Sequence, residues 1–298
     1  MNVEAPLEKG QSAPGYLVRE FVHGGHLLAL GTASIAAFSA ILLGRTPTIA
    51  LIVMAYLFSF GAYTINRSVE IDEDLISHPE RTKHLQSRKK YLPYVAGSCF
   101  GIGYLLAAFT NIPFFLVLLA PLVLSLVYSV GSKKFVQLIG AKRFKEKLLV
   151  KNVVISLGWA LAPLLVGLYY QQLGFLVLLL APFVFLRLFA ATIFFDARDT
   201  TGDIANGIKT IPTVYGFMKS FSIMDGVDFV SGLYILSLVV LGLIPLYASV
   251  MLVFPLYSVL YRVLALRYPS KMTLLCDVFC DGEYILWGPV LVLGRVLI

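Results

Sequence analysis

Residues 174–195 read GFLVLLLAPFVFLRLFAATIFF and run directly into the acidic sequence Asp196-Ala197-Arg198-Asp199-Thr200-Thr201-Gly202-Asp203. The apolar part holds one charged residue, Arg187, and is as long as the about 20 residues that a helix needs to cross a bilayer. In a helix, Asp196, Asp199 and Asp203 recur at i, i+3 and i+7 and share one face. This stretch predicts a membrane-spanning helix that ends in a stripe of carboxylates.

The composition of the whole chain is that of a membrane protein. Of 298 residues, 58% are hydrophobic and 14% are charged, against roughly 25% charged in an ordinary soluble domain. With a mean hydropathy of +0.83, the chain has more apolar side chain than a compact soluble domain can bury, which excludes the soluble globular and disordered classes. Segments of about ten residues with alternating polarity, typical of a membrane β-barrel, are absent from the sequence. The predicted class is all-α.

Apolar segments of suitable length recur about nine times. We expect one polytopic transmembrane domain over residues 1–298, in which residues 1–25 form a cytoplasmic lead-in without the pattern of a signal peptide. Two four-helix halves, at approximately 26–130 and 150–266, precede a final helix. The predicted spans are 26–44, 47–65, 91–110, 113–130, 150–170, 174–195, 225–244, 247–266 and 283–298.

Lysine and arginine are distributed unevenly between the connections. Residues 66–90 carry six, 131–151 carry seven, and 196–219 and 262–282 carry three each, whereas the turns near 45, 111, 172 and 246 carry only Arg45. Since cytoplasmic loops retain positive charge, this pattern predicts a multi-pass protein of the cell membrane with a cytoplasmic N-terminus. Topology also accounts for the net charge of +7, so nucleic acid is not an expected partner.

A second acidic stripe follows the predicted span at 47–65. Asn66, Glu70 and Asp74 recur at i, i+4 and i+8 and share one helix face over about 12 Å. Both stripes end an even-numbered span on the cytoplasmic side, and charged residues at such positions are costly and usually functional. Dense carboxylate oxygens suit Mg²⁺, which prefers to bridge carboxylates to phosphate oxygens. The pattern predicts a diphosphate ligand held through Mg²⁺, with the site open to the cytoplasm.

Cations and hydroxyls on the same predicted face could bind the phosphate oxygens. They are Lys133 and Lys134 after Tyr128-Ser129, and the pairs Lys151-Asn152 and Lys209-Thr210. The chain also has 21 Phe and 16 Tyr residues, whose rings could stabilise an allylic cation but also commonly face lipid. A ligand with a diphosphate head and a hydrocarbon tail in the bilayer fits this combination.

The two acidic motifs resemble those of the UbiA superfamily of intramembrane prenyltransferases, and the resemblance covers nearly the whole chain. The family's first motif, N-D-x-x-D-x-x-x-D, matches Asn66, Glu70 and Asp74, with Glu in place of the middle Asp and Arg67 in place of the Asp that follows Asn. Its second motif, D-x-x-x-D, matches Asp199 and Asp203, with Asp196 as an extra acid.

Further segments are similar to the same family. Residues 207–216, GIKTIPTVYG, look like the stretch that commonly follows the second motif, and residues 78–81, HPER, resemble the N-R-P-x-R-P segment after the first. Four residues fall where the family places diphosphate-binding groups: Tyr128, Ser129, Lys151 and Asn152.

The resemblance implies a Mg²⁺-dependent transfer of an isoprenyl chain within the membrane from a prenyl diphosphate, such as geranyl or geranylgeranyl diphosphate, to an aromatic or other lipid-precursor acceptor. Ionisation to an allylic cation releases diphosphate. The implied metal-binding residues are Asn66, Glu70, Asp74, Asp196, Asp199 and Asp203, of which all but Asp196 are also implied as catalytic. The implied substrate-binding residues are Arg67, Arg81, Tyr128, Ser129, Lys133, Lys151, Asn152 and Lys209.

Other interpretations are open at this point. A secondary transporter could use the carboxylates as a cation site, although transporter sites lie near the bilayer midplane rather than at helix ends. A phosphotransferase of the CDP-alcohol type is disfavoured because its D-G-x-x-A-R signature is missing from the sequence. Within the resembled family, a non-aromatic acceptor such as glyceryl phosphate is an alternative. Arg187 could contact substrate or pair with an acid on a neighbouring helix.

Overall fold

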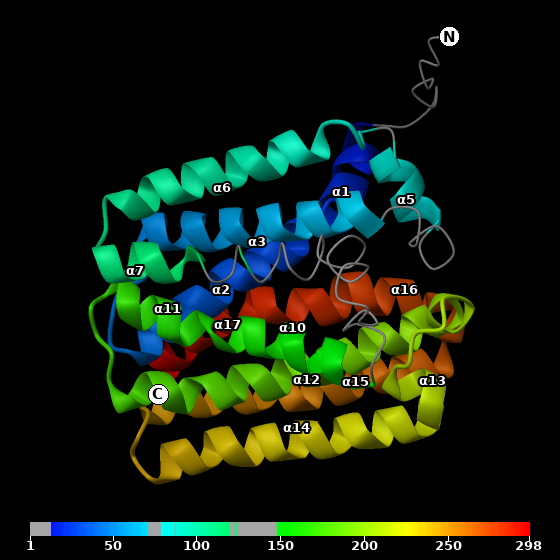
Figure 1. The fold of residues 1–298 in the computed structure, drawn as a ribbon. Coiled ribbons are helices and arrows are strands. Elements are labelled where there is room, and N and C mark those ends of the chain that lie inside the picture. The colour runs from blue at the N-terminus through cyan, green and yellow to red at the C-terminus, as the bar shows by residue number, and fades with distance from the viewer. Residues whose placement is uncertain (1–12, 71–78, 87, 120–122, 124–147) are drawn as a thin grey trace.

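The computed structural model describes residues 13–70, 79–86, 88–119, 123 and 148–298, with backbone alone at 13–17, 69–70 and 79–80. Every regular element within these ranges is a helix, which confirms the predicted all-α class. Figure 1 shows the long helices running side by side as one bundle.

The first half of the bundle contains α2 (His26–Leu42), α3 (Ile49–Glu70), α6 (Leu92–Ala108) and the short α7 (Ile112–Val117). The first three correspond to the predicted spans 26–44, 47–65 and 91–110, but α3 continues to Glu70 and so carries Asn66 in its last part. Most of the predicted span 113–130 lies outside the described residues.

The second half contains α10 (Val150–Ala160), α11 (Ala162–Tyr169), α12 (Phe175–Ala205), α14 (Phe217–Val240) and α15 (Val253–Arg267). The 3-10 segment η2 (Leu246–Leu252) leads directly into α15. The predicted span 150–170 consists of two consecutive helices, because Pro163 in the first turn of α11 lacks the N–H that would continue the hydrogen bonds of α10.

Five described segments are long and apolar enough to cross a membrane: Ile49–Ser68, Val150–Tyr169, Phe175–Ala205, Phe217–Val240 and Leu246–Arg267. At 1.5 Å per residue, the 31 residues of α12 extend about 46 Å, which exceeds the roughly 30 Å of a hydrocarbon core. The last turns of α12, with their three aspartates, therefore project beyond the apolar part of the bilayer.

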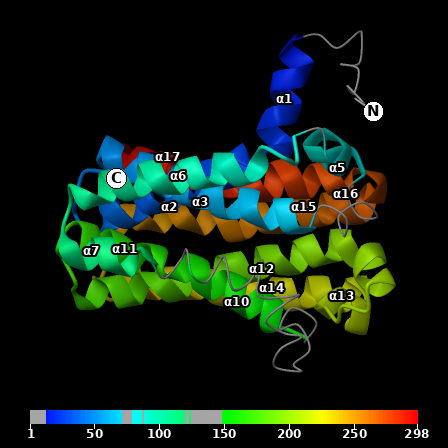
Figure 2. The same ribbon diagram turned by 45° about the horizontal axis from the view of Figure 1, so that its top comes forward.

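Short helices gather at one end of the bundle, opposite the C-terminus (Figure 1). They are α1 (Ala13–His23), α5 (Pro79–Gln86), α13 (Ile211–Tyr215) and α16 (Met272–Leu274). Figure 2 shows α1 standing out from the bundle. The chain turns from α1 into α2 at Gly25, where φ is 91° and a Cβ would lie 2.3 Å from Cδ1 of Tyr63. Only glycine suits this turn, since both the backbone angle and the Tyr63 ring exclude a side chain.

The last helix, α17 (Asp281–Leu297), connects both halves of the bundle. Trp287 of α17 is fully buried between Phe38 of α2 and Phe183 of α12, with ring centroids 5.1 and 5.2 Å apart respectively. After the short 3-10 segment η3 (Pro269–Lys271) and α16, a π-helical segment, η4 (Leu275–Cys280), leads into α17. Hydrogen bonds from Cys276 Sγ to the Phe194 carbonyl oxygen and from the Tyr257 hydroxyl to the Phe279 carbonyl oxygen hold η4 against α12 and α15.

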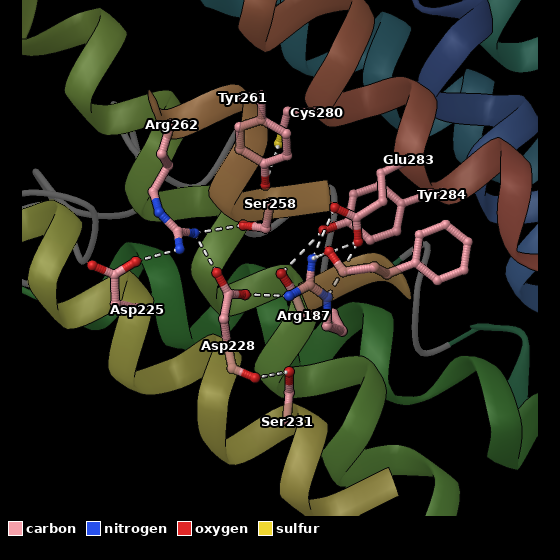
Figure 3. Close-up of polar contacts among 11 residues, drawn as sticks. Arg187, Asp225, Asp228, Ser231, Ser258, Tyr261, Arg262, Cys280, Glu283 and Tyr284 are labelled. Carbon is pink, nitrogen blue, oxygen red and sulfur yellow. Dashed lines mark hydrogen bonds and ion pairs between the residues drawn. The ribbon is translucent and has the colours of Figure 1, made fainter. Parts of the chain in front are cut away.

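A network of ion pairs, buried except at Asp225, joins three helices of the second half to α17 (Figure 3). Arg187 of α12 pairs with Glu283 of α17 and with Asp228 of α14, and Arg262 of α15 pairs with the same Asp228. Arg262 also contacts Asp225, one turn earlier in α14. The network thus decides between the two alternatives for Arg187 in favour of acids on neighbouring helices. α14 begins at Phe217, earlier than the predicted 225, and its first turn includes Ser220, which is buried and donates its hydroxyl to the Gly216 carbonyl oxygen at 2.7 Å.

Candidate functional site

A cavity of about 270 Å³ lies at the end of the bundle where α3 and α12 terminate. It is lined by two groups of charged side chains. The cations are Arg67 of α3, Arg81 of α5, Lys151 of α10 and Arg198 of α12. The acids are Asp199 and Asp203 of α12, Asp277 of η4 and Asp281 of α17.

The two predicted motifs meet in this cavity. Asn66 and Arg67 reach it from the last part of α3, and Asp199 and Asp203 reach it from the last two turns of α12. Two helices that lie far apart in the sequence thus supply polar groups to one space. Several further predicted residues fall outside the described part of the chain, namely Asp74, Tyr128, Ser129 and Lys133 and the side chain of Glu70.

Asp196 occupies a different position from the other two aspartates of α12. It is fully buried and is not among the residues that line the cavity. Its two carboxylate oxygens accept hydrogen bonds from Lys151 Nζ and from Asn152 Nδ2, both at 2.7 Å. Asp196 therefore fixes the start of α10 and directs Lys151, which does line the cavity. Lys209 is exposed and lies outside the cavity lining.

Asp203 has an environment that a bound cation would satisfy. Its side chain lines the cavity, the residue is 7% exposed, and its Oδ2 has no hydrogen-bond partner among the described residues. A buried carboxylate oxygen without a donor is unfavourable, and a divalent cation would satisfy it. Oxygen donors from Asn66, Asp199 and Asp203 are the type that Mg²⁺ prefers. Within the described ranges no three acidic, His or Cys side chains already form a metal-binding group, so Asp199 and Asp203 supply only part of a ligand set.

A third acidic segment at the cavity was not predicted from the sequence. Arg198 donates two hydrogen bonds to Asp199, from Nε at 2.7 Å and from Nη2 at 3.0 Å, and a third from Nη1 to Asp277. Asp281 follows Asp277 by one turn and lines the same cavity. The i, i+4 spacing of these two acids, in a basic connection before the last span, repeats the pattern of the other two stripes and could have identified them.

The lining of the cavity also includes apolar and aromatic side chains. They form an aromatic wall that consists of Leu188 and Phe195 of α12, Trp159 of α10, Tyr63 of α3 and Tyr284 of α17. Two of the rings lie against the cations of the cavity: the Arg67 guanidinium carbon is 4.7 Å from the Tyr63 ring centroid, and that of Arg198 is 5.3 Å from the Phe195 ring centroid. The Tyr284 hydroxyl donates to the Arg187 carbonyl oxygen at 3.0 Å, which links this wall to the buried ion network. The cavity thus combines a charged region with a wall that can accommodate hydrocarbon.

Outside the bundle, α1 is tied to α5 through Glu20. The Glu20 carboxylate lies 3.7 Å from His26 Nε2, accepts from His84 Nε2 at 2.8 Å and accepts from Arg88 Nη2 at 2.6 Å. Because His26, His84 and Arg88 favour its charged form, the pKa of Glu20 lies well below its usual range. This contact fixes the position of α5, from which Arg81 reaches the cavity.

Two curated relatives share moderate sequence similarity with this chain. The digeranylgeranylglyceryl phosphate synthase of Sulfurisphaera tokodaii is 29% identical over 62% of the chain, and the match spans 61% of that relative. The enzyme of the same name from Thermococcus kodakarensis is 28% identical over 71% of each chain.

Solved structures share the fold at lower identity. A UbiA homologue from Aeropyrum pernix K1 aligns over 91% of this chain and 96% of its own, with a TM-score of 0.67 and 14% identity. A UbiA homologue from Archaeoglobus fulgidus, bound to GPP and Mg²⁺, aligns over 92% and 99%, with a TM-score of 0.65 and 15% identity. Residues 26–275 match the sequence profile of the UbiA prenyltransferase family, and the chain therefore belongs to that family.

Proposed function

We propose that this protein transfers an isoprenyl chain from a prenyl diphosphate to the hydroxyl group of a glyceryl-phosphate-type acceptor, with Mg²⁺ as cofactor. The observation that carries the proposal is the convergence of Asn66, Asp199 and Asp203 on one cavity, in which a buried oxygen of Asp203 has no donor in the part of the chain that the structure describes. The aromatic wall beside these residues gives the reacting end of a prenyl chain an apolar surrounding.

The similarity to two digeranylgeranylglyceryl phosphate synthases favours glyceryl phosphate over the aromatic acceptors that the sequence alone favours first. The charges of the cavity support the same choice. Arg67, Arg81 and Lys151 line it together, and a diphosphate donor and a phosphate-bearing acceptor bring two anionic groups for them to bind.

In this proposal Asn66, Glu70, Asp74, Asp199 and Asp203 would hold Mg²⁺, which when bound neutralises charge on the diphosphate leaving group. Asp196 acts on the site through Lys151, which it orients toward the diphosphate oxygens. A role in binding the phosphate groups stays a prediction for four further residues: Tyr128, Ser129, Lys133 and Lys209.

The side chains of the cavity then guide bond breaking and bond formation. The rings of Tyr63, Trp159, Phe195 and Tyr284 exclude water and stabilise positive charge at the allylic carbon as its bond to the diphosphate oxygen breaks. The acceptor hydroxyl oxygen forms an ether bond to that carbon, and its proton passes to an oxygen of the departing diphosphate. Diphosphate leaves with the electron pair of the broken bond.

We further propose that the protein crosses the cell membrane nine times, with its N-terminus and the cavity on the cytoplasmic side. The distribution of Lys and Arg between the connections supports this orientation. The charged cavity lies at the end of the bundle that carries the described parts of the basic connections, as expected for ligands whose phosphate groups face the cytoplasm.

Diphosphate release by purified protein in lipid tests the proposed acceptor. The donors are geranyl and geranylgeranyl diphosphate, and the acceptors are glyceryl phosphate, geranylgeranylglyceryl phosphate and 4-hydroxybenzoate, each with Mg²⁺ or EDTA. We expect Mg²⁺-dependent release only with a glyceryl phosphate acceptor. Diphosphate release with 4-hydroxybenzoate alone would show that the proposed glyceryl phosphate acceptor is wrong. Flux of substrate across the bilayer without any product would show that the protein is a transporter and not a prenyltransferase.

A further inference from the structure

Arg198 lies between two carboxylates at the cavity. Its guanidinium donates to both oxygens of the adjacent Asp199, and its remaining terminal nitrogen donates to Asp277 of η4. The three side chains are 8%, 18% and 11% exposed respectively. Among the described residues, Asp199 and Asp277 are the carboxylates that hydrogen-bond Arg198.

These contacts create a competition at Asp199. Both of its oxygens accept from Arg198, yet Asp199 is one of the residues that would hold Mg²⁺. A cation that binds Asp199 must therefore displace the guanidinium from at least one oxygen. A buried guanidinium that loses its counter-ion is strongly destabilised, so Arg198 needs a second carboxylate in order to release the first.

Asp277 is placed to be that second carboxylate. It belongs to the π-helical segment η4, and such segments often mark functional sites because they displace side chains from regular helical positions. On either side of Asp277, Cys276 and Cys280 are fully buried, and Cys276 Sγ donates to the Phe194 carbonyl oxygen at 3.7 Å. The segment that carries Asp277 is therefore anchored to α12 directly beside Arg198.

We infer that Asp277 is a positioning residue for the metal site: it retains Arg198 when Asp199 binds a divalent cation. The inference rests on the proposed function to the extent that Asp199 is a metal ligand. Without Asp277, Arg198 would depend on Asp199 alone, and the cation would have to remove its last hydrogen-bonding carboxylate.

Asp281 provides a matched control. It lines the same cavity one turn after Asp277, and its carboxylate makes no hydrogen bond or ion pair to Arg198. Asp277→Asn and Asp281→Asn each replace one carboxylate of the cavity lining by an amide. Because burial, together with the nearby Asp277, raises the pKa of Asp281 to about 7, the two variants are compared at pH 8, where Asp281 is mostly charged. A difference between them in cation affinity then reports the contact with Arg198 rather than the loss of charge.

The test measures Mn²⁺ binding to the full-length protein in lipid by electron paramagnetic resonance, with geranylgeranyl diphosphate present. We expect Asp277→Asn to weaken Mn²⁺ binding at least tenfold and Asp281→Asn to weaken it less than threefold. Arg198→Gln, which removes the competitor, is expected to bind Mn²⁺ at least as tightly as the unmodified protein. In the Arg198→Gln background, Asp277→Asn is expected to change the affinity less than threefold.

Equal effects of Asp277→Asn and Asp281→Asn would overturn the inference. So would a tenfold loss on adding Asp277→Asn to Arg198→Gln, because Asp277 would then be a ligand itself. If the Asp277→Asn variant does not fold, the single variant Arg198→Gln still tests the inference. A loss of Mn²⁺ binding in that variant would overturn it. Failure of the proposed function is a separate result, namely normal Mn²⁺ binding by the unmodified protein without Mg²⁺-dependent prenyl transfer.

Discussion

Arg187 of α12 and Glu283 of α17 form a doubly hydrogen-bonded ion pair inside the bundle, with Arg187 Nη2 lying 2.6 and 2.8 Å from the two oxygens of Glu283 (Figure 3). Both side chains are fully buried. The pair joins the long helix that carries the second acidic motif to the helix that carries Tyr284 and Asp281. It therefore sets the relative position of two walls of the cavity.

Removal of one partner of this pair leaves a buried charge without its counter-ion. We predict that Glu283→Gln lowers the free energy of unfolding by about 3–5 kcal/mol, as measured by denaturant unfolding in detergent micelles. The double variant Arg187→Met with Glu283→Gln should recover much of the loss, because Asp228 keeps Arg262 as its partner. If the double variant is less stable than the single variant, the unpaired charge of Arg187 is not the main cause of the lost stability.

The role of Asp196 is separable from that of Asp203. Asp196→Asn removes the ion pair to Lys151 and should raise the KM for the prenyl diphosphate about tenfold, while Mn²⁺ affinity changes little. Asp203→Asn removes a cavity oxygen and should weaken Mn²⁺ binding strongly. Steady-state kinetics and metal titrations on the two variants check both parts. Equal loss of Mn²⁺ affinity would make Asp196 a metal ligand, as the family resemblance first implies.

The aromatic wall is expected to act on the rate of transfer. Replacement of Trp159 by Leu keeps an apolar side chain and removes a ring, so kcat should fall about tenfold, corresponding to the roughly 1–2 kcal/mol of a desolvated cation–π interaction. Tyr284→Phe retains its ring and loses only the hydrogen bond to the Arg187 carbonyl oxygen. Single-turnover transfer measures both variants, and an equal fall in each would argue against cation stabilisation by Trp159.

Gly25 and Gly44 allow a test of the turn beside the cavity. Both have positive φ, 91° and 71°, but a Cβ would meet the Tyr63 ring only at Gly25 and nothing within 4 Å at Gly44. In each alanine variant, backbone strain should lower the free energy of unfolding by about 1 kcal/mol. Gly25→Ala should lower the free energy of unfolding further, because its Cβ meets the Tyr63 ring. It should also reduce prenyl transfer, since Tyr63 lines the cavity. Thermal unfolding and turnover of the two variants, measured together, decide whether Tyr63 transmits the effect.

Sequence reasoning succeeded where a pattern is local. The apolar run at 174–195 and the three aspartates behind it predicted one long helix, and α12 includes all of them. Spans at 26–44, 47–65 and 91–110 were close to α2, α3 and α6 because their polar boundaries are clear. Asn66 lies in the same cavity as Asp199 and Asp203, which agrees with their corresponding positions at the ends of two predicted spans.

Other features depend on partners that lie far away in the sequence. The pairing of Asp228 with Arg187 and Arg262 could not be predicted, since only the fold brings α12, α14 and α15 together. The orientation of Asp196 toward Lys151, away from the cavity, likewise depends on how α10 packs on α12. The spacing of Asp277 and Asp281 was visible in the sequence, but the contact of Asp277 with Arg198 depends on how η4 packs against α12.

The most direct test of the central claim is mass-spectrometric detection of the ether product formed from geranylgeranyl diphosphate and glyceryl phosphate or its geranylgeranyl ether. The unmodified protein and Asp203→Asn are compared in lipid, with Mg²⁺ and with EDTA. We predict product from the unmodified protein with Mg²⁺, none with EDTA, and at least a hundredfold less from Asp203→Asn. Product formation that is equal in EDTA, or unchanged in Asp203→Asn, would contradict a metal-dependent transfer at this cavity.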